Sequence, residues 1–264
     1  MKSFKRTHWC YLLLLWSSLF VLGYTSLQIA KWFDDTKKLE VIIKETNPTA
    51  LRGSNIAAES STKQTSTVSP YLNVDFSKLQ ARNEEIIAWI KIPLVHLDIP
   101  IVQTTDNSFY LTHDLDRQKN KLGWIFVDTR SNIEHMGMNT TIYGHNALNQ
   151  QMFGSLKKLL SLAEGYSEDG ELIQFTTEYH EMVFQICSVY VTDSEDWEYI
   201  QSSFIDDAAK SSFIHMIREK NQVARFTTNS LSIQDKFITL STCYGPAGTT
   251  KRLVVQAKLI MQNE

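Results

Sequence analysis

Three side chains capable of chemistry stand at the ends of strand-like runs in this chain. Cys243 ends one apolar run, Arg252 begins the next, and His145 ends another run far upstream. A cysteine attacks carbonyl carbons as its thiolate, and a free thiol has a pKa of about 8.5, so it needs a proton acceptor nearby. A histidine is the usual acceptor near neutral pH. Thiol, imidazole and guanidinium together suffice for acyl transfer by a cysteine enzyme.

The guanidinium has a different part in such a reaction. Arginine stays protonated and cannot serve as a base, so Arg252 would hold a substrate carbonyl and stabilise its oxyanion. We assign the base to His145 because it follows Gly144 at a strand end, where loops carry function. The remaining histidines lie in the apolar N-terminal segment, in connecting segments, in a hairpin turn and on a helix: His8, His96, His113, His135, His180 and His215.

Alternation along the last two runs predicts the face on which these groups lie. Cys243 and Arg252 fall on the outer face, together with Thr239 and Ser241, where a substrate strand could lie. Phe237 shares that face, so we expect the helical segment before this run to cover it. The core face carries apolar residues at every second position: Ile238, Leu240, Leu253, Val255 and Ala257.

The elements that must position these groups are short strands. Val, Ile, Thr and aromatic residues are enriched in eight runs, namely 88–92, 97–103, 123–128, 139–145, 171–177, 181–191, 235–242 and 252–260. Helical spacing precedes the first run from residue 75, follows the fourth over 152–161, and separates the sixth and seventh over 202–220. We therefore predict a mainly β, mainly antiparallel, eight-stranded barrel with an N-terminal helix and a helix inserted between strands 6 and 7.

Composition bounds the rest of the chain. Its 264 residues are 43% hydrophobic and 21% charged, which indicates one good-sized folded domain with accessory segments. The net charge is −3 and the basic residues are scattered, so no nucleic-acid partner is expected.

The N-terminal segment 7–30 holds no Lys, Arg, Asp or Glu and is long enough to span a bilayer. Basic residues in segment 1–6 favour a cytoplasmic N-terminus and a single-pass anchor, with the folded domain outside the cell. Segment 31–70 reads as a juxtamembrane helix and a flexible spacer, and 71–264 as the catalytic domain. A cleaved signal peptide remains the alternative, because the sequence does not decide whether this segment is removed.

The chain has three cysteines, which is unusual for an exported protein. Cys10 lies in the apolar segment and Cys187 reads as a small buried hydrophobe, which leaves Cys243 as a reactive thiol. A Cys187–Cys243 disulfide is the alternative. A metal site formed by His135, His145 and Cys243 would be a further one, but no CxxC or HxxxH spacing supports it. No metal and no cofactor are expected.

These residues resemble the sortase family. Thr239–Cys243 reads TLSTC, matching the family motif TLxTC, and Arg252 and His145 stand where the family has its arginine and histidine. The resemblance spans roughly residues 75–260. The long helical segment between strands 6 and 7 is typical of class B, whereas a class C lid motif is missing from this sequence.

The resemblance implies a membrane-anchored transpeptidase on a Gram-positive cell surface. Cys243 would cleave a C-terminal sorting motif after its Thr and form a thioester, with His145 as acid and base and Arg252 on the oxyanion. Ser241 and Thr242 would contact the substrate, and an amine of a cell-wall precursor would resolve the thioester. The alternatives are a class B-like pilin polymerase using a pilin Lys, a cysteine peptidase that hydrolyses its thioester, and a non-enzymatic surface β-barrel that binds peptides. The exact motif, the acceptor and the oligomeric state are not predicted.

Overall fold

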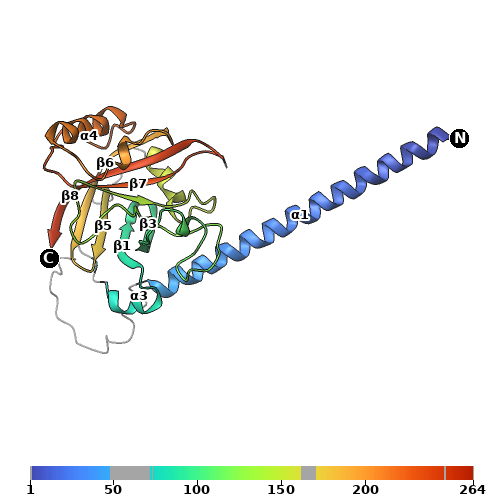
Figure 1. The fold of residues 1–264 in the computed structure, drawn as a ribbon, viewed down its shortest axis with the longest axis horizontal. Coiled ribbons are helices and arrows are strands. Elements are labelled where there is room, and N and C mark those ends of the chain that lie inside the picture. The colour runs from blue at the N-terminus through green and yellow to red at the C-terminus, as the bar shows by residue number, and fades with distance from the viewer. Residues whose placement is uncertain (1, 48–71, 73, 162–170, 247, 264) are drawn as a thin grey trace, which may run out of the picture. The chain divides into compact units, whose positions relative to one another are not determined.

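The computed structural model describes residues 2–47, 72, 74–161, 171–246 and 248–263 (Figure 1). The chain divides into two compact units, Met1–Ile42 and Ile43–Glu264. From residue 48 to residue 70, the predicted spacer lies outside the described residues.

One long helix, α1, runs over Lys2–Thr46. It is the one helix in the described part of the chain that is long and apolar enough to cross a membrane, by length and composition alone, with the candidate span beginning at Tyr11. The predicted juxtamembrane helix continues it without a break at residue 31. Hydroxyl groups along the apolar part bond to carbonyls three or four residues earlier in the helix, which lets them sit in apolar surroundings: Ser17, Ser18, Thr25 and Ser26.

The second unit is built on a closed barrel with the strand order β1-β2-β3-β4-β7-β8-β6-β5. Two neighbouring pairs, β2–β3 and β4–β7, run parallel, and the other pairs run antiparallel. The prediction of an eight-stranded, mainly antiparallel barrel is confirmed. The strands are β1 Ile86–Ile92, β2 Leu97–Val102, β3 Phe126–Val127, β4 Asn139–Tyr143, β5 Leu172–Thr177, β6 Glu181–Asp193, β7 Phe237–Cys243 and β8 Lys251–Asn263.

Short helices connect the strands. The helix before β1 is α3, Phe76–Arg82, whose first turn is capped by Asp75 through the Lys78 amide. The remaining turns are 3₁₀ helices: η1 Pro93–Val95, η2 Phe109–Leu111, η3 Phe153–Ser161 and η5 Glu198–Ile200. The predicted helix over 152–161 is thus a 3₁₀ helix. Its Gly154 packs so closely on the backbone of Ala147 that a Cβ at position 154 would overlap the Ala147 carbonyl oxygen.

The predicted inserted helix is α4, Asp207–Lys220, between β6 and β7 (Figure 1). Asp206 caps its start by accepting a hydrogen bond from the Ala209 amide at 2.8 Å. Phe213 on α4 meets Phe237 on β7 edge to face, with ring centroids 6.0 Å apart. The prediction that this segment covers Phe237 is confirmed, and α4 and η5 close a second apolar cluster outside the barrel.

That covering corrects one expectation about the outer face of β7. Thr239 and Ser241 are buried on it, not open to a substrate strand. The Thr239 hydroxyl donates to the Asn139 side chain at 2.7 Å, and Ser241 lies against Tyr199 of η5. Only the end of the strand, at Cys243, stays partly exposed.

Candidate active site

Cys243 and Arg252 are direct partners in the antiparallel β7–β8 ladder. Cys243 is the last residue of β7 and Arg252 the second residue of β8, and both are half-buried. Directly opposed residues in such a ladder have their Cβ atoms about 4.5–5.5 Å apart on one face. The ladder therefore sends the thiol and the guanidinium out of the sheet on the same side.

His145 reaches the same end of the barrel from β4. The parallel β4–β7 register pairs Tyr143 with Ser241, and the Gly144 amide donates to the Ser241 carbonyl at 3.2 Å. His145 follows β4 by two residues, so it leaves that strand next to the end of β7. The structure thus places Cys243 and Arg252 on paired strands and His145 in the segment that follows the neighbouring strand β4.

Carbonyl oxygens hold the Arg252 side chain. Its Nη1 donates to the carbonyl of Lys251, the first residue of β8, at 3.1 Å and to that of Thr249, two residues before the strand, at 3.4 Å. Neither partner is charged, so these bonds orient the guanidinium without neutralising it. A planar cation held this way can meet negative charge developing on a substrate oxygen.

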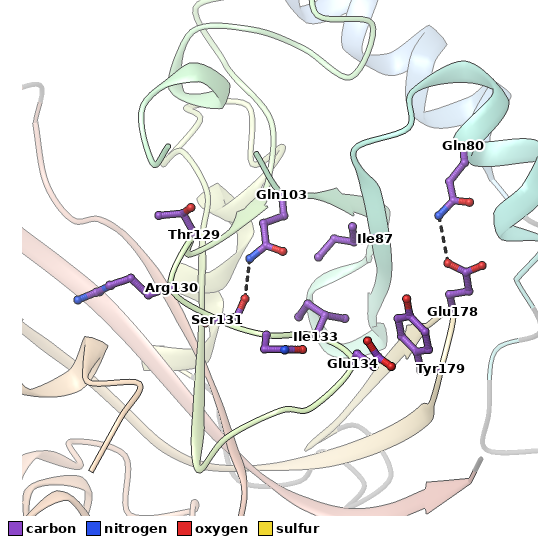
Figure 2. Close-up of a pocket in the computed structure, with 11 residues that line it drawn as sticks. Gln80, Ile87, Gln103, Thr129, Arg130, Ser131, Ile133, Glu134, Glu178 and Tyr179 are labelled. Atoms are coloured by element: carbon purple, nitrogen blue, oxygen red, sulfur yellow. Dashed lines mark hydrogen bonds between the residues drawn. The ribbon is translucent and has the colours of Figure 1, made fainter. Parts of the chain in front are cut away.

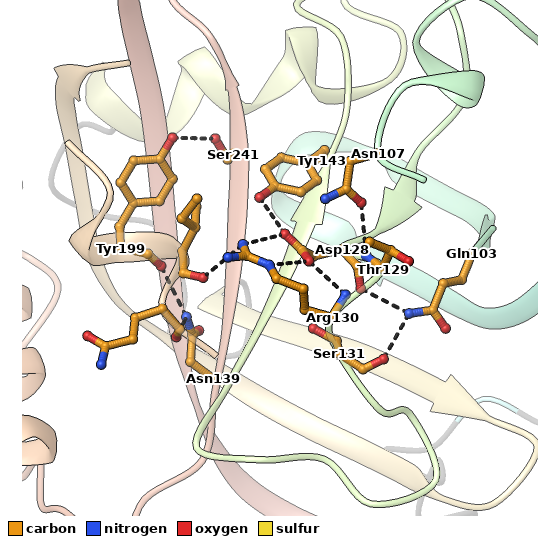
Figure 3. A network of polar contacts seen from close by, with 12 residues as sticks. Gln103, Asn107, Asp128, Thr129, Arg130, Ser131, Asn139, Tyr143, Tyr199 and Ser241 are labelled. Carbon is orange, nitrogen blue, oxygen red and sulfur yellow. Dashed lines mark hydrogen bonds and ion pairs between the residues drawn. The ribbon is translucent and has the colours of Figure 1, made fainter. Parts of the chain in front are cut away.

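Tyr199 is a neighbour that the sequence did not point to. The Ser241 hydroxyl donates to the Tyr199 hydroxyl at 3.4 Å (Figure 3). Burial raises the pKa of the Tyr199 phenol, while the Ser241 hydrogen bond and the charge of Arg252 oppose that rise. Tyr199 therefore lies within electrostatic reach of Arg252, in a stretch whose only sequence signal was its aromatic content.

A polar network centred on Asp128 holds the segment that carries Tyr199 (Figure 3). The Asp128 carboxylate accepts hydrogen bonds from the Arg130 guanidinium and from the Tyr143 hydroxyl at 2.8 Å. Arg130 also donates to the Ile200 carbonyl at 3.4 Å, and Asn139 donates to the Tyr199 carbonyl at 3.0 Å. Because β4 supplies Asn139 and Tyr143, this network ties η5 to the strand that leads to His145.

The side chains of Thr242 and Cys187 do not join the Cys243–Arg252 pair. Thr242 is 3% exposed, and its hydroxyl is a buried oxygen without a hydrogen-bond partner in the described structure. Strand alternation directs it to the face opposite Cys243. Cys187 is buried on β6, where its thiol donates to the Gln256 carbonyl at 3.3 Å and burial raises its pKa to about 12. Both cysteines are free, so the alternative of a Cys187–Cys243 disulfide is wrong.

The metal alternative has no support in the described residues, where no group of three or more His, Cys, Asp or Glu side chains is placed to hold an ion.

A cavity of about 490 Å³ has a lining that includes Arg130 of the Asp128 network but none of the three reactive groups (Figure 2). It is lined mainly by the loop after β3 and the β5–β6 turn, with Gln80 of α3, Ile87 of β1 and Gln103 after β2 completing the wall. Since β3 runs antiparallel to β4, the loop after β3 returns to the start of β4, not to its His145 end. The cavity shares no residue with the Cys243 site.

Comparisons with known proteins agree with this fold. The Sortase domain family model matches residues 90–260. Sortase B of Staphylococcus aureus is 31% identical over 191 residues, covering 72% of this chain and 76% of that protein. Sortase B of Listeria monocytogenes is 30% identical over 203 residues, covering 74% of this chain and 78% of that protein.

Solved structures give the same result. The 2.0 Å crystal structure of Staphylococcus aureus sortase B matches with a TM-score of 0.64 and 32% identity, covering 70% of this chain and 86% of that one. Sortase B from B. anthracis in complex with AAEK1 matches with a TM-score of 0.69 and 29% identity, covering 86% and 99%. This chain belongs to the sortase family, in class B, and is a cysteine transpeptidase.

Proposed function

We propose that this transpeptidase is held at the membrane by α1, cleaves a C-terminal sorting motif after its Thr, and transfers the new acyl group to an amine of a cell-wall precursor. The observation that carries the proposal is the pairing of Cys243 with Arg252 across β7 and β8, with His145 two residues beyond the end of the adjoining strand β4. A thiol, a proton carrier and a fixed cation near one partly exposed strand end would suffice for acyl transfer.

Cys243 is the nucleophile in this scheme. His145 takes the thiol proton, and the sulfur attacks the Thr carbonyl carbon to form a tetrahedral intermediate. The Arg252 guanidinium stabilises the oxyanion. Collapse of the intermediate breaks the C–N bond, His145 protonates the departing amine, and a thioester on Cys243 remains.

An amine then resolves the thioester. The acceptor nitrogen attacks the thioester carbon and gives its proton to His145 as the C–S bond breaks. Staphylococcus aureus sortase B has been solved as a substrate complex, and sortase B has also been solved in complex with triglycine. By analogy, a sorting-motif peptide and a peptide amine are the two partners we propose here. Contacts from Ser241 and Thr242 to that peptide stay predictions; both side chains are buried in this structure, so such contacts would have to come from the strand backbone or follow a local rearrangement.

The anchor and its orientation rest on α1 and its flanks. The helix is apolar enough to span a bilayer, and Lys2, Lys5 and Arg6 precede its apolar part. The tendency of basic flanks to stay in the cytoplasm places the barrel outside the cell.

Intact-mass spectrometry tests the proposal. The full chain, in detergent, is mixed with peptides carrying candidate sorting motifs, with triglycine or lysine as acceptor amine. We expect a mass gain on the chain equal to the acyl fragment ending in Thr, and its loss when triglycine is added. The Cys243→Ala variant should gain nothing. An adduct that persists in the alanine variant, or release by water at the same rate with and without amine, would refute the assignment.

A further inference from the structure

The ring of His145 makes one hydrogen bond that decides which of its nitrogens can react. Its Nε2 lies 2.7 Å from the backbone carbonyl oxygen of Leu111. A carbonyl oxygen only accepts hydrogen bonds, so Nε2 must be the donor and must carry a hydrogen in both the neutral and the charged ring. Nδ1 is then the only ring nitrogen free to take up and release a proton.

The carbonyl that accepts this bond belongs to a well-fixed turn. The Leu111 amide donates to the Ser108 carbonyl at 3.1 Å, which closes η2. Asp106 Oδ1 accepts hydrogen bonds from the amides of Ser108 at 2.6 Å and Phe109 at 2.7 Å, which holds the start of the turn. Beyond it, the Trp124 amide donates to the carbonyl of buried Tyr110 at 2.8 Å. The acceptor for His145 is therefore anchored on both sides.

Gly123 makes room for the ring at the same place. Its φ is +58°, and a Cβ built there would overlap the Tyr110 carbonyl oxygen and stand 2.9 Å from Cδ2 of His145. A side chain at this position would be strained and would push the imidazole out of its place. The Nε2–Cδ2 edge of the ring thus fits a notch formed by Leu111 and Gly123, and Nδ1 is the ring atom opposite that edge.

We infer that the Leu111 carbonyl and Gly123 position His145 as the Nε2–H tautomer and leave Nδ1 as the nitrogen that carries the proton in catalysis. This inference rests on the proposed function. In each cycle, Nδ1 takes the Cys243 S–H proton as the C–S bond forms and delivers it to the amine nitrogen as the C–N bond breaks. It then accepts a proton from the incoming amine, whose nitrogen displaces the sulfur.

Nitrogen NMR of the histidine rings tests the tautomer directly. The full chain in detergent is labelled with ring-¹⁵N histidine, and the His145 signals are identified by their absence from the His145→Gln spectrum. At a pH where the ring is neutral, we expect Nε2 to show a directly bonded hydrogen and Nδ1 to have the shift of an unprotonated nitrogen. The reverse pattern overturns the inference.

Gly123→Ala tests the notch through catalysis. A ring displaced by about 1 Å can cost about 10²-fold in rate, so we expect kcat for thioester formation to fall about that much, with KM little changed and both tautomers present in the spectrum. Gly137→Ala is the matched control, because a Cβ there makes one tight contact, 3.3 Å from the Ser202 carbonyl oxygen, whereas a Cβ at position 123 would overlap the Tyr110 carbonyl oxygen, and Gly137 lies in the β3–β4 connection. An alanine at position 123 that keeps wild-type kcat overturns the notch. Should this variant not fold, the wild-type spectrum alone decides.

The two proposals fail in different ways. If the wild-type chain forms no thioester with any peptide, the proposed function fails whatever the spectrum shows. If the thioester forms while Nδ1 of the neutral ring carries the hydrogen, only the present inference fails.

Discussion

Cys243 and Arg252 face each other across β7 and β8 as a directly opposed residue pair. The arginine is held by the backbone carbonyls of Thr249 and Lys251, just before and at the start of β8, so its orientation does not depend on a bound substrate. Because the guanidinium is fixed, its planar shape as well as its charge determines how it can bind a substrate oxygen. The first prediction follows from that.

Arg252→Lys should lower kcat/KM for thioester formation by about 10²–10³, because a compact ammonium cannot reproduce the planar fork of the guanidinium. The measurement is the initial rate of acyl adduct formation by mass spectrometry. Arg218→Lys is the matched control, because Arg218 also donates to two backbone carbonyls but lies on α4. A lysine variant as fast as wild type would remove Arg252 from the mechanism.

The two cysteines of the barrel should differ sharply towards a thiol reagent. Cys243 is half-buried at a strand end, whereas burial raises the pKa of the Cys187 thiol to about 12, which suppresses its reactive thiolate. Native protein treated briefly with iodoacetamide and then digested should carry the label at Cys243, with Cys187 labelled only after denaturation. Equal labelling of both in the folded protein would contradict the burial of Cys187.

Asp128→Asn should destabilise the fold in a pH-dependent way. Burial raises the pKa of the Asp128 carboxyl, but hydrogen bonds from Arg130 and Tyr143 outweigh it and leave the pKa below 3.8. A carboxyl whose pKa is lowered on folding stabilises the fold at pH values above its pKa in the unfolded state. That stabilisation is lost as the pH falls through its pKa in the folded state. We therefore expect a cost of about 1–3 kcal/mol at pH 7 that shrinks below about pH 4.

Unfolding in denaturant at pH 7 and at pH 3 measures this difference. Asp207→Asn is the control, because Asp207 pairs with Lys210 on the surface and such pairs contribute under about 1 kcal/mol. A difference between wild type and Asp128→Asn that stays constant across this pH range would exclude the ionised network.

Phe213→Ala should cost about 3–5 kcal/mol, as expected for truncating a large buried aromatic side chain. Phe213 is 3% exposed and joins α4 to Phe237 on β7. Ile205→Ala removes a side chain that is 95% exposed and should change stability by less than about 0.5 kcal/mol. Thermal or denaturant unfolding compares the two, and an equal effect would mean that α4 adds little to the fold.

Much of the fold could be predicted from local patterns. The strands β7 and β8 are rich in β-branched and other apolar residues, and their alternation predicts that Leu240 and Val255 face the core, where both are fully buried. Cys243 and Arg252 could be placed on one face because their strands follow each other in the chain with a short connection. Their pairing therefore joins residues that are close in sequence.

What could not be predicted depends on contacts between distant segments. Alternation marks Ser241 as an outer residue, but only tertiary packing shows that Tyr199 of η5 covers it. The contact between His145 and the Leu111 carbonyl joins residues 34 positions apart and uses a main-chain atom, which no side-chain pattern records. In the sequence Gly123 begins the strand-like run 123–128, and its approach to the imidazole is visible only in three dimensions.

The β7–β8 ladder keeps an unbroken register from Phe237 to Cys243, whereas β6–β8 carries two register shifts. Inserting or deleting a residue inside β7 or β8 would invert one reactive side chain relative to the other. A change of length in the connection before Thr249, whose carbonyl holds Arg252, would leave their pairing in the ladder intact. The chain can therefore vary that part of the connection, and with it the surroundings of the thiol, while keeping the reactive pair. Evolutionary or engineered diversity in this enzyme should accumulate in the connecting loop and not in the two strands.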